Sequence, residues 1–259
     1  MNCPDGIAYL YDVEKLEVLN EKLDETILDI RSVLFPKALS PCTPGPFFSK
    51  NAWGGIKVPY PAFIRVIQLS QQDWTSTVGR KWQEARGIQQ PLIDKILLQR
   101  DNWCRETLIH ESLHRFSIFS KYFGLRKYLS VFEDGLTEFL TGYILFKKYP
   151  SCYAKWLTKT AKECSMTYSR SVRRFYAFGH FVDIHVLIDF YFWQPNRNWE
   201  NSWAQFLGSI REIGYPDFRD IFNCAWIDAT EAFFEECRRA FGNRFLTLSS
   251  SKIDYNSLP

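Results

Sequence analysis

The spacing of apolar residues predicts a chain built mainly from amphipathic helices. Between residues 13 and 34, apolar side chains recur at steps of three and four, with Glu, Lys and Asp between them. This is the pattern of a helix with one apolar face. Ser130, followed three residues later by Glu133, forms a capping box for a helix that we expect to end at Lys148. The other segments with a helical pattern are 103–120, 152–170, 172–193, 199–213 and 217–241.

Two shorter segments have the character of strands. Residues 63–69 alternate between apolar and polar side chains, as a half-buried strand does, and 96–99 is a second candidate. The order of these elements predicts an α+β fold that is mostly helical. We expect a small N-terminal sheet packed on the helix at 103–120, followed by a helical C-terminal part.

The prolines at 36, 41, 44 and 46 mark a boundary, because they exclude regular structure from that stretch. We therefore expect an N-terminal unit at 1–48, a main domain at 49–245 and a flexible, Ser-rich tail at 246–259. The apolar stripe of the first helix is expected to pack on the chain's own core. The alternative is that this helix binds a regulatory partner.

Composition excludes several classes of protein. A hydrophobic content of 46% with 17% aromatic residues is ample for a core, and the net charge of +3 comes without basic runs. We therefore expect no nucleic-acid surface. The longest apolar window, 175–193, is interrupted by His and Asp, which are costly in lipid, so we expect no membrane span.

The cysteines indicate a reducing compartment. The seven Cys are odd in number, widely spaced and without a C-x-x-C pair, which argues against a disulfide framework and a structural zinc ribbon. Residues 1–5 show no basic region leading into an apolar run, so we expect no secretory signal. The cytoplasm is the expected location.

The candidate chemistry lies at His110-Glu111-Ser112-Leu113-His114. On a helix, positions i and i+4 lie one above the other, so both imidazoles can hold one zinc ion with Glu111 beside it. Catalytic zinc takes three protein ligands and leaves one position for water. The acidic cluster at 133–138 is the place to look for the third ligand.

Residues 100–145 resemble the gluzincin class of zinc metallopeptidases. The similarity consists of the His-Glu-x-x-His motif followed, about twenty residues on, by an acid, a Gly and a Thr-Glu pair. Metzincins would need Gly and His at positions 117 and 120, where this chain has Ser. The resemblance implies a zinc peptidase whose third ligand is a carboxylate on the helix after the motif.

Three carboxylates compete for that role. The acid-small-x-x-acid pattern of the class implies that Asp134 is the ligand and that Glu138 orients a histidine. Glu138 and Glu133 are the alternatives, although Glu133 already has an explanation as the capping-box acid. Asp134 is favoured because it shares a helix face with Glu138, although its shorter side chain requires its backbone to sit closer to the metal.

The mechanism implied by the resemblance uses Glu111 as general base and a later Tyr or His as oxyanion donor. Tyr176 and His180 lie at i and i+4 with Gly179 between them and are the candidates. The substrate would be a peptide or protein, bound as an added strand along 63–69. The alternatives are a zinc hydrolase acting on a non-peptide substrate and a binding or regulatory protein that retains the peptidase fold. The intact Glu111 argues against the latter.

Overall fold

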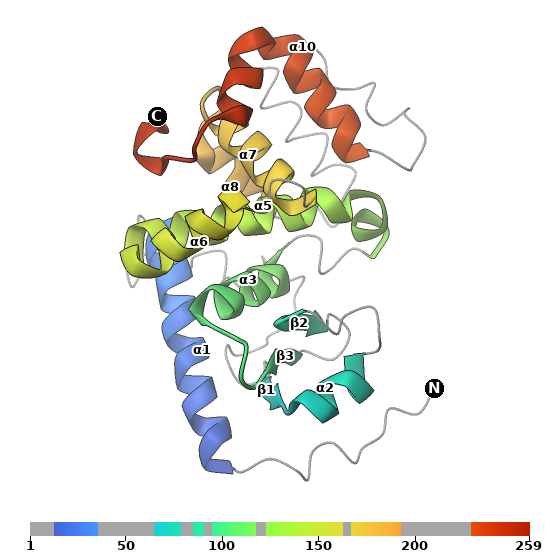
Figure 1. Ribbon diagram of the computed structural model, residues 1–259, viewed down its shortest axis with the longest axis vertical. Helices are drawn as coiled ribbons and strands as arrows, with labels where there is room; N and C mark the ends of the chain where they lie inside the picture. The colour runs from blue at the N-terminus through green and yellow to red at the C-terminus, as the bar shows by residue number, and fades with distance from the viewer. Residues whose placement is uncertain are drawn as a thin grey trace.

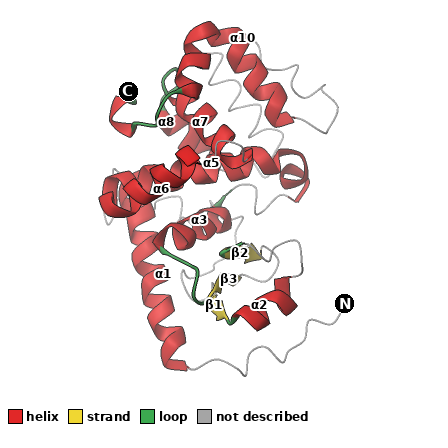
Figure 2. Ribbon diagram, in the orientation of Figure 1, coloured by secondary structure: helices red, strands yellow, loops and turns green. Residues whose placement is uncertain are grey.

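The computed structural model describes residues 13–35, 65–78, 85–90, 95–117, 123–162, 167–192 and 229–259. Helices dominate this part of the chain, and its strands gather in one small sheet (Figure 1, Figure 2). The expected α+β fold, mostly helical with a small sheet toward the N-terminus, is therefore confirmed. None of the helices in these ranges is long and apolar enough to cross a membrane.

The sheet is mixed and lies at one end of the molecule (Figure 2). Its strands are β1 (Arg65–Leu69), β2 (Gly87–Gln90) and β3 (Lys95–Gln99). Their order is β1-β3-β2, with β1 parallel and β2 antiparallel to the central β3. In the described part of the chain, β2 is thus one edge of the sheet. The segments 63–69 and 96–99 correspond to β1 and β3, whereas β2 was not predicted.

The helices of the described ranges form the rest of the molecule. They are α1 (Val13–Leu34), α2 (Gln71–Val78), α3 (Arg105–Phe116), α5 (Phe123–Lys148), α6 (Pro150–Lys162), α7 (Thr167–Gly179), α8 (Ile184–Phe192) and α10 (Ala229–Ser250). The long α5 crosses the middle, with α3 and the sheet on one side and α7 and α10 on the other (Figure 1). The expected helix at 199–213 lies outside the described residues.

The first helix belongs to the main core. Leu23, Ile27 and Ile30 on its apolar stripe are buried, and α1 packs against α3, β1 and α5. The chain therefore covers this stripe itself, as expected. The proline-rich stretch after it lies outside the described residues.

The helix that follows the motif begins earlier than its local pattern suggested. α5 starts at Phe123, so Ser130 lies in its interior and the predicted capping box is wrong. A Ser-x-x-Glu pair is compatible with a helix start and with a helix interior, and packing of the helix decides which of these positions it takes. Glu133 is accordingly buried inside α5, with no exposed surface.

The C-terminal segment is packed, contrary to the expected flexible tail. Gly242 does interrupt the last helix, because its φ of 62° lies in the left-handed region, but α10 resumes and continues to Ser250. Residues 251–259 then return to the core, where Ile253 and Tyr255 are each only 3% exposed. Burial of these two side chains supplies the anchoring that the Ser-rich composition does not reveal.

Candidate metal centre

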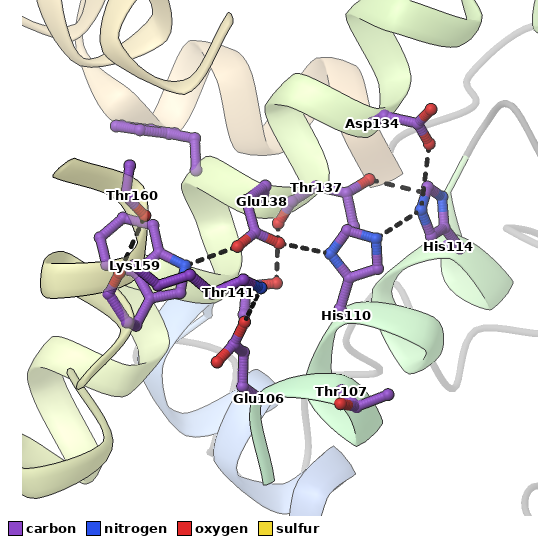
Figure 3. A network of polar contacts seen from close by, with 12 residues as sticks. Glu106, Thr107, His110, His114, Asp134, Thr137, Glu138, Thr141, Lys159 and Thr160 are labelled. Carbon is purple, nitrogen blue, oxygen red and sulfur yellow. Dashed lines mark hydrogen bonds and ion pairs between the residues drawn. The ribbon is translucent and has the colours of Figure 1, made fainter. Parts of the chain in front are cut away.

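Helix α3 places the motif between the sheet and α5. It begins at Arg105, where the Cys104 backbone N–H donates to Thr107 Oγ1 at 3.4 Å. Leu108, Ile109 and Leu113 are fully buried and fix the orientation of the helix. His110 and His114 consequently face α5, as Figure 3 shows.

The two imidazoles turn toward each other. His110 Nε2 and His114 Nε2 are 3.0 Å apart, and the ring centroids are separated by 4.6 Å. This is the arrangement expected of histidines four residues apart on one helix face. Both ε nitrogens therefore converge on the same small region.

Each opposite ring nitrogen meets a glutamate of α5. His110 Nδ1 lies 2.7 Å from Glu138 Oε2, and His114 Nδ1 lies 2.8 Å from Glu133 Oε1 (Figure 3 draws the first pair). A carboxylate accepts, so each Nδ1 donates its proton to its glutamate, and Nε2 is then the nitrogen that a neutral imidazole would offer to a metal. Histidines that bind metals are commonly held in this tautomer by such a partner.

A third carboxylate lies on the ε side. Asp134 Oδ1 is 3.4 Å from His114 Nε2. Ligands of tetrahedral zinc at about 2.0–2.1 Å are separated by about 3.3–3.4 Å from one another. Two imidazole nitrogens and one carboxylate oxygen are the donor types that zinc binds, although no group of three such side chains in the described ranges already has the geometry of a metal site.

The support around the two glutamates differs. Ser117 Oγ donates to Glu133 Oε1 at 3.3 Å, and Thr137 Oγ1, which lies 3.5 Å from His114 Nδ1, contacts Tyr191 OH at 2.6 Å. Glu138 instead accepts from the indole Nε1 of Trp156, at 2.6 Å on Oε1. Sequence reasoning missed both sets of contacts.

Charge is concentrated at the His110–Glu138 pair. Burial by itself would lower the pKa of His110, but the hydrogen bond and charge of Glu138, with the charges of Glu111 and Asp134, raise it to about 9. Burial by itself would raise the pKa of Glu138, but the hydrogen bond and charge of His110, with the charge of Lys159, lower it to about 2. Without a metal, the two side chains thus form an imidazolium–carboxylate pair.

Glu111 lies against the edge of the sheet. It is 8% exposed, and a Cβ placed on Gly87 of β2 would lie 2.9 Å from Glu111 Cγ and 2.7 Å from Thr107 Cγ2. Only glycine permits this close approach of the strand to α3. The candidate base therefore sits directly beside β2.

Tyr176 and His180 make their contacts elsewhere. Tyr176 lies on α7, and His180 comes directly after this helix. Tyr176 OH lies 2.8 Å from Ser257 Oγ, and the rings of Tyr176 and His180 meet edge to face. Burial and the neighbouring Arg244 lower the pKa of His180. Tyr176 thus contacts the C-terminal segment, and neither residue makes a hydrogen bond or ring contact with His110 or His114, so an oxyanion role for either stays a prediction without geometric support.

The structure thus brings together six of the residues singled out by sequence. His110, His114, Asp134, Glu138 and the buried Glu133 lie between α3 and α5, and Glu111 lies next to the histidines on α3 but faces β2. Comparison with protein-family models, with curated proteins and with solved structures found no match.

Proposed function

We propose that this chain is a zinc-dependent metallopeptidase. His110, His114 and Asp134 would hold the metal, and Glu111 would act as general base. The observation that carries the proposal is the pair of ε nitrogens at 3.0 Å, each imidazole held from behind by its own glutamate, with Asp134 beside them. Two helix-surface histidines would not need two dedicated carboxylates from a neighbouring helix.

The positions of the three acids indicate different roles. Glu133 and Glu138 fix the tautomer and orientation of the rings, whereas Asp134 is on the side where the ε nitrogens converge. Of the three acids, these positions therefore favour Asp134 as the third ligand. Glu133 is an orienting residue here rather than a capping acid.

Zinc at this position would supply a Lewis acid that polarises the scissile carbonyl and acidifies a water molecule. Glu111 is close to the motif histidines on α3 but is directed toward β2. From there its carboxylate would accept the proton of the attacking water and deliver it to the leaving amine. Such proton transfer requires a carboxylate within hydrogen-bond reach of the attacking water, and Glu111 follows the first motif histidine directly on α3.

An extended peptide would bind along β2 rather than β1. β2 is an edge of the sheet in the described part of the chain and touches Glu111 through Gly87. β1, the strand expected from sequence to bind substrate, packs beside α1 on the far side of β3 (Figure 1). Strand addition at β2 would hold a scissile bond near the base through backbone hydrogen bonds.

The cysteines support the expected compartment. Cys104, Cys152 and Cys237 are free thiols in the described ranges. Free thiols suit a reducing environment such as the cytoplasm.

The experiment is peptide cleavage by zinc-loaded wild type and Glu111→Gln over a broad peptide library. The variant should keep its fold and zinc, because Glu111 is not a ligand, and lose about 10² to 10⁴ in rate. Glu106→Gln is the matched control on the same helix, where Glu106 pairs with Lys159 at 2.9 Å, and it should cleave within about twofold of wild type. Equal cleavage by wild type and Glu111→Gln would refute the proposal.

A further inference from the structure

Glu138 is held by two donors at once. Its Oε2 accepts from His110 Nδ1 at 2.7 Å, and its Oε1 accepts from Trp156 Nε1 at 2.6 Å. Trp156 lies on α6 and is fully buried. Each oxygen of this carboxylate therefore has its own partner from a different helix (Figure 3 shows the network around Glu138).

The indole of Trp156 is itself fixed by packing. The indole lies against Gly142 of α5, where an added Cβ would lie 2.4 Å from Trp156 Cη2. The ring of Tyr153 stacks at 5.8 Å between centroids with an interplanar angle of 23°. Glycine at position 142 thus makes room for the indole, and these contacts hold the buried ring in place.

The C-terminal segment completes this enclosure. The ring of Tyr255 lies 6.2 Å from that of Trp156, and its hydroxyl donates to the backbone carbonyl of Phe139, the residue after Glu138, at 2.6 Å. Tyr153 OH donates to the Ile253 carbonyl at 3.3 Å, which ties the segment to α6. A chain of contacts therefore runs from residues 251–259 through Trp156 and Glu138 to His110.

We propose that Trp156 is a positioning residue for the candidate metal centre, and that Tyr255 holds it in place. By occupying Oε1 of Glu138, the indole N–H directs Oε2 toward Nδ1 of His110 and so aims Nε2 at the metal. The inference rests on the proposed function for its purpose, but the contacts it concerns exist in the metal-free protein.

The physical reason is rotational freedom. A carboxylate with one donor can turn about its terminal torsion, which is broad and shallow. Two donors in different directions remove that freedom, and a buried carboxylate oxygen left without a partner is unfavourable. Loss of the indole N–H would therefore let Glu138 turn away from His110.

The primary test is Trp156→Phe, which keeps an aromatic ring but removes the donor. In metal-free protein, the Nδ1 proton of His110 should give a resolved downfield NMR signal that is absent from His110→Ala. Trp156→Phe should shift or broaden this signal and weaken zinc binding about tenfold. Trp74→Phe is the matched control, because Trp74 is equally buried but belongs to α2 and packs against the sheet, and it should change neither quantity.

A second variant decides the matter if Trp156→Phe does not fold. Tyr255→Phe removes one hydroxyl that donates to α5 and should weaken zinc binding about threefold, with the same NMR signal perturbed. Tyr149→Phe, whose hydroxyl instead donates to Asp29 of α1, is its control. An unchanged His110 signal in folded Trp156→Phe, or in Tyr255→Phe where the former fails, overturns the inference. If wild type binds no zinc but the variant still shows the predicted change in the His110 signal, the proposed function is refuted and the inference about Trp156 is not.

Discussion

The two histidines of the motif share one helix and one geometry, yet they are held in opposite surroundings. The side chain of His114 is 5% exposed, and its partner Glu133 is completely buried among the hydroxyls of Ser117, Thr137 and Tyr191. The side chain of His110 is 20% exposed, and its partner Glu138 is 15% exposed. The Tyr191 hydroxyl keeps its proton, because burial and then the nearby Glu133 raise its pKa well above the usual range.

This difference assigns different roles to the two sides. The His114 side is a closed polar cluster within the core, so its groups should serve folding as well as the proposed metal binding. The His110 side opens toward solvent together with Asp134, whose side chain is 25% exposed. In our proposal, the indole of Trp156 on α6 holds the His110–Glu138 pair in place, rather than burial of the histidine itself.

The largest effect should come from the acid on the ε side. Asp134→Ala removes a proposed ligand and should weaken zinc binding by more than about 100-fold, the upper end for a residue that only touches a ligand. Glu133→Ala should weaken it by about 10- to 100-fold without abolishing it. Zinc titration against a competing chelator distinguishes them. If Glu133→Ala empties the site and Asp134→Ala does not, the ligand assignment is wrong.

Replacing each histidine by alanine should lower the free energy of unfolding by different amounts on the two sides. In metal-free protein, His114→Ala leaves Glu133 buried without its main donor and should destabilise the fold by about 3 kcal/mol. His110→Ala should cost about 1 kcal/mol, because Trp156 still donates to Glu138 and water can reach it. Urea denaturation with both variants measures this. Equal losses would show that burial does not distinguish the two sides.

Replacement by glutamine should lower zinc affinity to a different extent at the two orienting glutamates. Glu138 serves His110 and Trp156 with separate oxygens, so Glu138→Gln must present an NH₂ group to one of two donors. Glu133 accepts from His114 and Ser117 with the same Oε1, which a Gln carbonyl can replace. We expect zinc affinity to fall about 100-fold for Glu138→Gln and about tenfold for Glu133→Gln. The reverse order would contradict the hydrogen-bond assignment.

The smallest effect concerns the predicted oxyanion donor. Removal of such a donor ordinarily reduces the rate by about 10²–10³. Tyr176 OH contacts Ser257 instead, so Tyr176→Phe should change kcat by less than about twofold, within the cost of one neutral hydrogen bond. A hundredfold loss in a folded, zinc-loaded variant would restore Tyr176 to the catalytic site.

Local pattern was enough to predict the elements with a strong period. The apolar stripe of residues 13–34 predicts α1, because a period of 3.6 over many residues leaves no other structure. α2 was missed, although Ser70 Oγ accepts from the Asp73 backbone N–H at 3.2 Å and a Ser-x-x-Asp signal was present. β2 carries one large apolar residue, Ile88, and depends on pairing with β3. Such pairing has no local signal.

The same division applies to the candidate site. The motif spacing placed the two histidines, and the acid-small-x-x-acid pattern placed Asp134 and Glu138 beside them, although their chemistry stays a prediction. The contact of Glu133 with His114 was hidden because the same residues match a capping box. Trp156 had no signal, because its contact with Glu138 depends on how α6 packs on α5.

The zinc content of the purified protein tests the central claim most directly. Wild type should contain about one zinc per molecule, as a catalytic site requires. The His110→Ala, His114→Ala double variant should contain none, because both nitrogen ligands are gone. Elemental analysis of the two proteins after identical purification gives the answer, with Glu106→Gln as the control that should retain its zinc. Full zinc occupancy in the double variant, or none in wild type supplied with zinc, would contradict the account.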